Sequence, residues 1–154
     1  MFSSRFNTAM TSITRVMRPS SAPPAFSRPL FLNAVPAGMP APGDDIIDTG
    51  LDLNRHLIQR PAATFFVRVT GDSMTGVGIF SGDLLVVDRS RSASNGSIIV
   101  AVVDGELTVK RLRKSGGKSM LLAENPAYGP VPIGEGTDVE VWGVVTAVIH
   151  RFEG

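Results

Sequence analysis

The chain contains no cysteine, and this absence excludes disulfides, thiolate zinc sites and cysteine nucleophiles. Histidine is nearly as scarce, because only His56 and His150 occur. Their wide separation gives weak support to a histidine metal site or a Ser–His–Asp triad, so we expect no metal and no cofactor. No apolar run approaches the roughly 18 residues that a bilayer crossing requires. We therefore expect no membrane contact, and the lack of cysteine suits the reducing cytoplasm.

Acidic residues are missing from residues 1–43, which contain four arginines and many serines and prolines. Eleven of the fifteen basic residues and all fourteen acidic residues therefore belong to the rest of the chain, which has a net charge of −3. Proline fixes φ and lacks an amide donor, so we predict a flexible, extended arm over 1–43 and a folded domain over 44–154. The arm's composition also resembles a transit peptide. No continuous basic stripe marks a dedicated nucleic-acid binder, so DNA is expected only as an indirect partner.

Beyond the arm, the hydrophobic pattern is that of short β-strands. Strands are predicted over residues 64–70, 84–87, 98–103, 106–112 and 139–149, and a short helix over 52–59. Eleven prolines and sixteen glycines agree with many tight turns and argue against a helical bundle. The pattern predicts a mainly β fold, a strongly twisted and partly closed β-sheet domain.

A hairpin in this pattern sets the position of one lysine. Asp104-Gly105 is a strong two-residue turn signal, which pairs Val103 with Glu106 and, by counting outward, Ile99 with Lys110. Most lysines on strands face solvent or protect a sheet edge. A lysine in an apolar site has its charged form disfavoured, however, and its neutral amine can act as a base. Lys110 is therefore a candidate catalytic base.

Two further features accompany this lysine. Ser73 lies in Gly-Asp-Ser-Met directly after the strand at 64–70, where neighbouring amides can converge on an oxyanion. The same residues also suit an ordinary turn. Serine needs a base such as Lys110, because its hydroxyl is a poor nucleophile at its free pKa. Ala37 and Gly38, in the proline-rich arm, are small enough for an extended strand to lie deep in a narrow cleft.

Several blocks of the chain resemble UmuD-type members of the peptidase S24 family, whose wider group includes LexA and phage repressors. The blocks are LDLNRHLIQRPAATFFVRVTGDSM (51–74), SGDLLVVD (81–88), VDGELTVK (103–110), NPAY (125–128) and VWGVV (141–145). They run in the same order, so the resemblance covers about residues 36–150. The Ala-Gly pair is that of LexA, whereas the best-known UmuD-type protein has Cys-Gly. Residues 1–30 lie outside the resemblance.

The resemblance implies a LexA/UmuD-type domain that cuts its own arm. By it, Ser73 is the nucleophile, Lys110 the general base, and the amides of Asp72 and Ser73 form the oxyanion hole. The bond between Ala37 and Gly38 is the scissile bond. The implied function is that of a subunit of an error-prone translesion DNA polymerase in the SOS response. The implied partners are a second copy of the chain, the RecA–single-stranded-DNA filament, which stimulates cleavage, and a Y-family, UmuC-like polymerase subunit.

Two alternatives remain open at this point. One is a self-cleaving transcriptional regulator of the LexA or phage-repressor type without its DNA-binding domain. The 37 residues before the expected cut are rich in serine and proline and do not predict a helix-turn-helix. The other alternative is a non-catalytic binding module on the same fold, in which Ser73 and Lys110 are packing residues.

Overall fold

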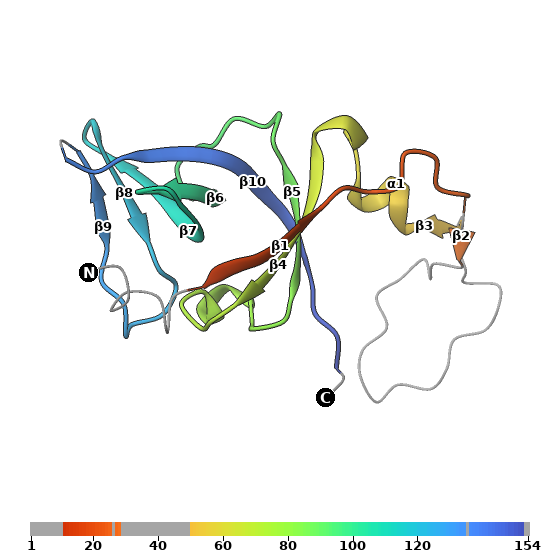
Figure 1. The fold of residues 1–154 in the computed structure, drawn as a ribbon, viewed down its shortest axis with the longest axis horizontal. Helices are drawn as coiled ribbons and strands as arrows, with labels where there is room; N and C mark the ends of the chain where they lie inside the picture. Colours follow the sequence, from red (N-terminus) through yellow and green to blue (C-terminus); the bar gives the residue numbers. More distant parts are fainter. Residues whose placement is uncertain (1–10, 26, 29–49, 135, 153–154) are drawn as a thin grey trace. The chain divides into compact units, whose positions relative to one another are not determined.

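An eight-stranded antiparallel sheet dominates the computed structural model, which describes residues 11–25, 27–28, 50–134 and 136–152 (Figure 1). In spatial order its strands are β1 (Ser12–Met17), β4 (Thr64–Thr70), β5 (Leu84–Asp88), β10 (Val139–Ile149), β6 (Ile98–Val103), β7 (Glu106–Ser115), β8 (Lys118–Leu122) and β9 (Val131–Ile133). Because β1 pairs with both β4 and β7, the sheet closes into a barrel. The mainly β prediction is confirmed.

The described residues belong to two compact units, and those of the smaller one are 20–25, 27–28 and 50–59. It contains a two-stranded sheet of β2 (Ser27–Arg28) and β3 (Leu51–Asp52), followed by α1 (Leu53–Leu57). Asp52 caps this helix by accepting a hydrogen bond from the Asn54 amide at 3.0 Å, which explains why the helix starts there. Within the described ranges, no helix has both the length and the apolar character needed to cross a membrane.

The strands of the barrel form where the sequence alternates. Along β4, Val67 and Val69 are buried while Arg68 and Thr70 are exposed, as expected for a strand with one face toward a core. The turn between β6 and β7 has positive φ at Asp104 (48°) and Gly105 (86°), the conformation of a two-residue hairpin loop.

The register of that hairpin is the predicted one. Val103 pairs with Glu106, and Ile99 pairs with Lys110. Because side chains alternate along a strand, this register fixes which residues of β7 face the core. The position of Lys110 in the fold is thus confirmed.

The core consists of two clusters of buried side chains. The first is made by Val67, Val69, Met74, Ile79, Leu85, Val87, Val100 and Val109. The second is made by Ile99, Ala101, Leu112, Leu121 and Val144. Gly143 in β10 allows a close strand approach, since a Cβ there would lie 2.6 Å from Val87 Cγ1. The pairing of β10 with β6 shifts register just before this glycine.

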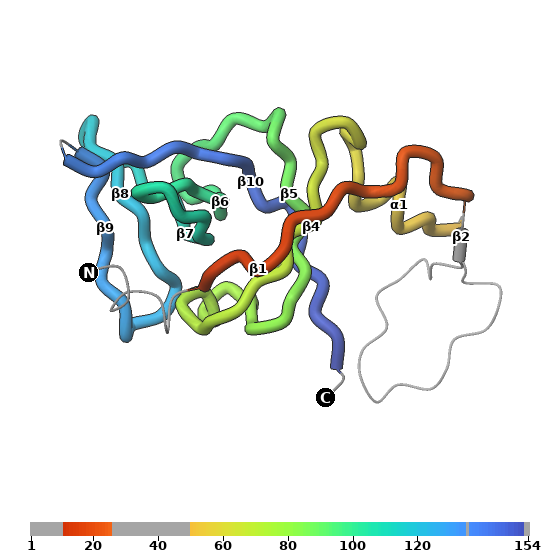
Figure 2. The backbone as a smooth tube through the Cα atoms, viewed as in Figure 1, coloured from red at the N-terminus to blue at the C-terminus, as the bar shows by residue number. Residues whose placement is uncertain are grey.

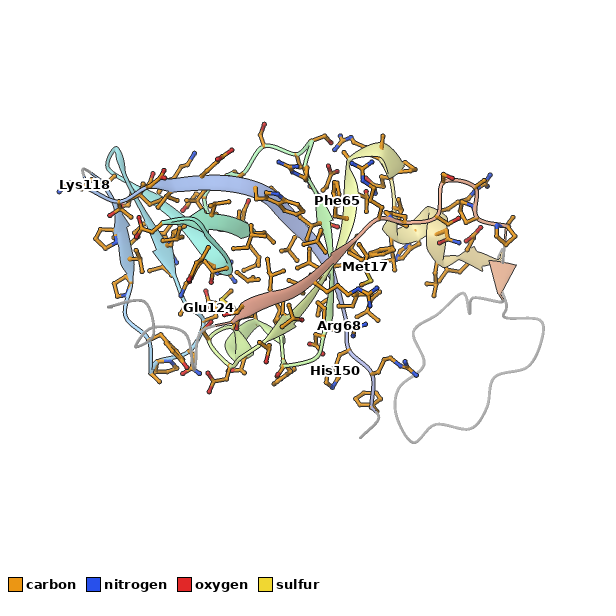
Figure 3. All side chains as sticks on the ribbon, in the orientation of Figure 1. Met17, Phe65, Arg68, Lys118, Glu124 and His150 are labelled. Atoms are coloured by element: carbon orange, nitrogen blue, oxygen red, sulfur yellow. The ribbon has the colours of Figure 1, made fainter. Side chains whose placement is uncertain are left out.

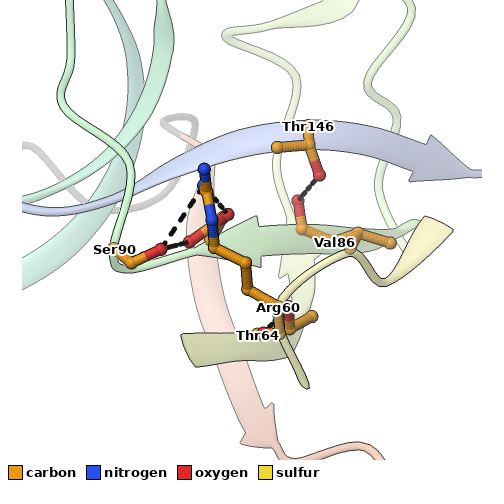
Figure 4. A network of polar contacts seen from close by, with 6 residues as sticks. Arg60, Thr64, Val86, Ser90 and Thr146 are labelled. Carbon is orange, nitrogen blue, oxygen red and sulfur yellow. Dashed lines mark hydrogen bonds and ion pairs between the residues drawn. The ribbon is translucent and has the colours of Figure 1, made fainter. Parts of the chain in front are cut away.

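A polar network joins residues around the start of β4 and the end of β5 (Figure 4). Arg60 Nη1 contacts Asp88 Oδ2 at 3.0 Å, and Ser90 donates to Asp88 Oδ1 through its amide (2.8 Å) and its hydroxyl (2.6 Å). Burial raises the pKa of Asp88, but the Ser90 hydrogen bonds and the Arg60 charge outweigh it, so the pKa is lowered overall. Thr64 Oγ1 donates to the Arg60 carbonyl at 2.7 Å. Asp88 is therefore a structural strand-end residue.

Candidate active site

Ser73 lies in the loop between β4 and the short 3₁₀ helix at Thr75–Val77, and it is fully buried. The loop begins at Gly71, whose φ of 100° favours glycine and lets the chain turn sharply after the strand. The next side chain, Met74, belongs to the first core cluster. The sequence thus anchors the loop at both ends and fixes the serine between them.

A second segment of the chain, residues 124–128, holds this loop in place. The Glu124 amide donates to the Ser73 carbonyl, and the Asn125 side-chain amide donates to the Asp72 carbonyl, both at 2.8 Å. Tyr128 Oη donates to Asp72 Oδ1 at 2.5 Å. That hydrogen bond, followed by burial and the Asp72 charge, raises the pKa of Tyr128 to about 12. Figure 3 labels Glu124 and shows the side chains of this region.

The two amides proposed for the oxyanion hole are those of Asp72 and Ser73. Among the described residues, no hydrogen bond from the Asp72 or Ser73 amide is present. The Asp72 carbonyl accepts a hydrogen bond from Asn125, and this orients the peptide group that carries the Ser73 amide. Free, oriented amides are what stabilisation of a developing oxyanion requires.

Lys110 is buried on β7, with a relative exposure of 1%. Its neighbours Val109 and Ile99 are also fully buried. Within the described part of the chain, the Lys110 ammonium forms no ion pair or hydrogen bond. Burial therefore lowers the pKa of Lys110 and favours the neutral amine, the form that accepts a proton.

Thr11 connects the Ser73 loop to the strand of Lys110. The Thr11 amide donates to Ser73 Oγ at 2.8 Å. The Thr11 carbonyl accepts from the Val109 amide at 3.3 Å and from Thr108 Oγ1 at 3.1 Å. One residue thus touches the serine hydroxyl on one side and the neighbour of Lys110 on the other. The site lies between the end of β4 and the middle of β7, where β1 begins (Figure 2).

Some of these residues had no signal in the sequence. Thr11 forms hydrogen bonds with residues that are 62 to 98 positions away, and no local sequence pattern predicts these contacts. Asn125 and Tyr128 fall in one of the blocks that resemble the family, but no role was predicted for them. Ala37 and Gly38 lie outside the described residues, so the cleavage site stays a prediction.

Among the described residues, neither histidine forms a hydrogen bond or ion pair with Ser73 or Lys110. His56 is in α1, and His150 Nδ1 contacts Asp83 Oδ1 at 2.5 Å. Asp83 also accepts a hydrogen bond from the Phe80 amide at 2.8 Å, which makes it a turn residue. Over the described ranges, no group of three or more His, Cys, Asp or Glu side chains is placed to hold a metal ion.

Comparison with known proteins shows which protein family the chain belongs to. The model of the family described as "Peptidase S24-like" matches residues 29–146, and the chain belongs to this family. It is 46% identical to Protein SamA of Salmonella typhimurium strain LT2 over 136 residues, covering 88% of this chain and 94% of that protein.

Two further relatives define the breadth of the match. Protein MucA of Escherichia coli is 41% identical over 134 residues, covering 85% of this chain and 90% of MucA. The LexA repressor of Ectopseudomonas mendocina is 39% identical over 121 residues, covering 78% of this chain and 59% of that repressor. The resemblance predicted from sequence is confirmed: this is a UmuD-like member of a family of SOS-related, self-cleaving serine peptidases.

Proposed function

We propose that the chain is a self-cleaving serine peptidase in which Ser73 is the nucleophile, Lys110 the base and Ala37–Gly38 the scissile bond. Residues 1–43 act as the cleavable arm and residues 44–154 as the peptidase domain. The observation that carries this assignment is Lys110, a buried lysine without a described polar partner. Its neighbour Val109 is hydrogen-bonded to Thr11, and Thr11 is hydrogen-bonded to Ser73.

In the first step, the neutral Lys110 Nζ takes the proton from Ser73 Oγ as this oxygen attacks the carbonyl carbon of Ala37. The carbonyl oxygen becomes an oxyanion, which the amides of Asp72 and Ser73 stabilise. The C–N bond then breaks, and the Lys110 ammonium returns its proton to the nitrogen of Gly38. The products are an ester on Ser73 and a free amino terminus at Gly38.

In the second step, water hydrolyses the ester. The water oxygen attacks the ester carbonyl carbon while Lys110 takes a proton from the water. The bond to Ser73 Oγ then breaks, and the Lys110 ammonium donates this proton to Ser73 Oγ. The products are a carboxyl group at Ala37 and the regenerated serine. No metal or cofactor takes part in this sequence.

The cleaved form serves an error-prone translesion polymerase in the SOS response. It acts as a homodimer with a Y-family, UmuC-like polymerase subunit, and the RecA–single-stranded-DNA filament stimulates the cut. The identity of 46% to SamA and 41% to MucA, each over most of this chain, supports this function. The filament supplies no catalytic group, because nucleophile, base and substrate belong to one chain.

Cleavage with activated RecA tests this role. Purified protein is incubated with RecA, ATP and single-stranded DNA, each omitted in turn, and intact mass follows the product. The expected product is a 117-residue fragment starting at Gly38, since 37 of the 154 residues are removed, and it forms fastest in the full mixture. Ser73→Ala is the control that binds the filament without cutting. Equal rates in all mixtures would reject RecA as the trigger.

A further inference from the structure

The strand β1 occupies the place beside Ser73 where an extended substrate would have to lie. It pairs antiparallel with β4, and Ser12 pairs both with Thr70 of β4 and with Thr108 of β7. Thr11, directly before β1, contacts Ser73 and β7 through its main chain. β1 is thus an N-terminal segment bound between the two strands that flank the nucleophile.

The contact at Ser73 is not arranged for cleavage of β1 itself. The Thr11 amide points its N–H at Ser73 Oγ, and this places the oxygen close to the plane of the peptide group. Attack on a carbonyl carbon requires the oxygen to approach from above that plane. The hydrogen bond also occupies a lone pair of the oxygen that must attack. β1 therefore blocks the nucleophile rather than serving as its substrate.

The scissile segment would need the same strand edges. An extended peptide binds a sheet by hydrogen bonding to a free edge. Here both edges of β4 are already paired, one with β5 and the other with β1. On its opposite edge β1 pairs with β7, so the space between β4 and β7 is filled by β1. A second strand cannot bind these edges while β1 holds them, so the two segments exclude one another.

Three features weaken the hold of β1. The hydroxyl of Thr11 is buried without a hydrogen-bond partner in the described structure, which is unfavourable. Arg15 lies directly opposite Arg68, and like charges in such a pair repel. Neither arginine forms an ion pair with a described acidic residue. The pairing also shifts register between Ile13 and Arg15.

We propose that β1 is a built-in competitor of the scissile segment, a peptide ligand of the active site that must leave before Ala37–Gly38 can bind. This inference rests on the proposed function and adds to it a regulated state of the same site. The unsatisfied hydroxyl and the arginine pair keep the competitor replaceable.

A reversible lock tests the proposal, because the chain has no cysteine of its own. Ser12→Cys combined with Thr70→Cys places two thiols on directly paired residues, at a spacing that suits a disulfide. Lys114→Cys combined with Ser119→Cys is the matched control on the paired strands β7 and β8. Self-cleavage without RecA is followed by intact mass, before and after reduction.

The proposal predicts that oxidation stops self-cleavage in the Ser12/Thr70 variant, that reduction restores it, and that the control variant cuts in both states. Equal cutting by the oxidised and reduced Ser12/Thr70 variant would overturn the inference alone. Failure of this disulfide to form would also overturn it, since β1 would then not lie beside β4. If neither the wild type nor any reduced variant cuts at any pH, the proposed function fails and the inference falls with it.

Substitutions in β1 should change the rate in both directions. Thr11→Val removes the unsatisfied hydroxyl, so β1 binds more firmly and unassisted cleavage slows about tenfold. Arg15→Glu creates an attractive pair with Arg68 and slows cleavage about threefold, whereas Arg15→Gln should slow it less.

Thr11→Pro removes the N–H that binds Ser73 Oγ and should accelerate cleavage. Ala22→Pro is its control, at an exposed position outside β1. Unchanged rates in Thr11→Pro and Arg15→Glu together would contradict competition by β1.

Discussion

Replacing Lys110 by methionine should change the pH dependence of stability in a defined direction. The side chains have similar length, but methionine carries no ionisable group. Because burial lowers the pKa of Lys110 in the folded state, the unfolded chain binds one more proton between that lowered pKa and the ordinary value of 10.5. Stability of the lysine-containing protein therefore rises with pH across this window, and Lys110→Met lacks that rise.

The size of the effect follows from proton linkage. One extra proton on the unfolded state gives a slope of about 1.4 kcal/mol per pH unit in the free energy of unfolding. At the low-pH end of the window, Lys110→Met should therefore have a higher free energy of unfolding than its parent. This difference should decrease by about 1.4 kcal/mol per pH unit as the pH rises toward 10.5. With 1% exposure, solvent screening of the Lys110 charge is small.

The assay is urea unfolding at a series of pH values from about 7 to about 10, with Ser73→Ala in every protein to prevent cleavage. Lys114→Met is the matched control, since Lys114 is an exposed lysine on the same strand and should leave the slope unchanged. Parallel stability curves for the parent and Lys110→Met across the whole range would refute the claim that the folded protein holds this amine neutral.

Three other substitutions test the surroundings. Tyr128→Phe removes the hydrogen bond to Asp72 and should slow self-cleavage about tenfold without moving the urea midpoint; equal rates would contradict a positioning role. Gly143→Ala places a Cβ 2.6 Å from Val87 Cγ1 and should lower the free energy of unfolding by about 1–3 kcal/mol, measured by urea unfolding. The lowered pKa of Asp88 stabilises the fold above its unfolded value of 3.8, a contribution lost as pH falls through the folded pKa. Asp88→Asn should therefore lose less stability than wild type in acid unfolding.

The barrel was predictable to the extent that local signals set its register. Asp104-Gly105 leaves one simple pairing for its hairpin, and that pairing alone placed Lys110 opposite Ile99. Gly116-Gly117 is a similar turn signal: its positive φ values of 57° and 77° connect β7 to β8, which pair antiparallel.

The rest of the site depends on contacts between distant segments. The Ser73 loop is oriented by residues 124–125, about fifty positions later, and no local pattern encodes that meeting. β1 was missed because residues 12–17 lack a turn to a neighbouring strand; their partners are β4 and β7. The extended arm expected over 1–43 thus includes a strand that closes the barrel.

The most direct test of the central claim is an intact-mass time course of unassisted cleavage at neutral and alkaline pH. Wild type, Ser73→Ala, Lys110→Ala and Lys110→Arg are compared. The account predicts that wild type alone yields the 117-residue fragment beginning at Gly38, and that its rate rises with pH as more Lys110 loses its proton. A fragment that begins elsewhere, or cleavage by Lys110→Ala at the wild-type rate, would contradict the serine–lysine mechanism.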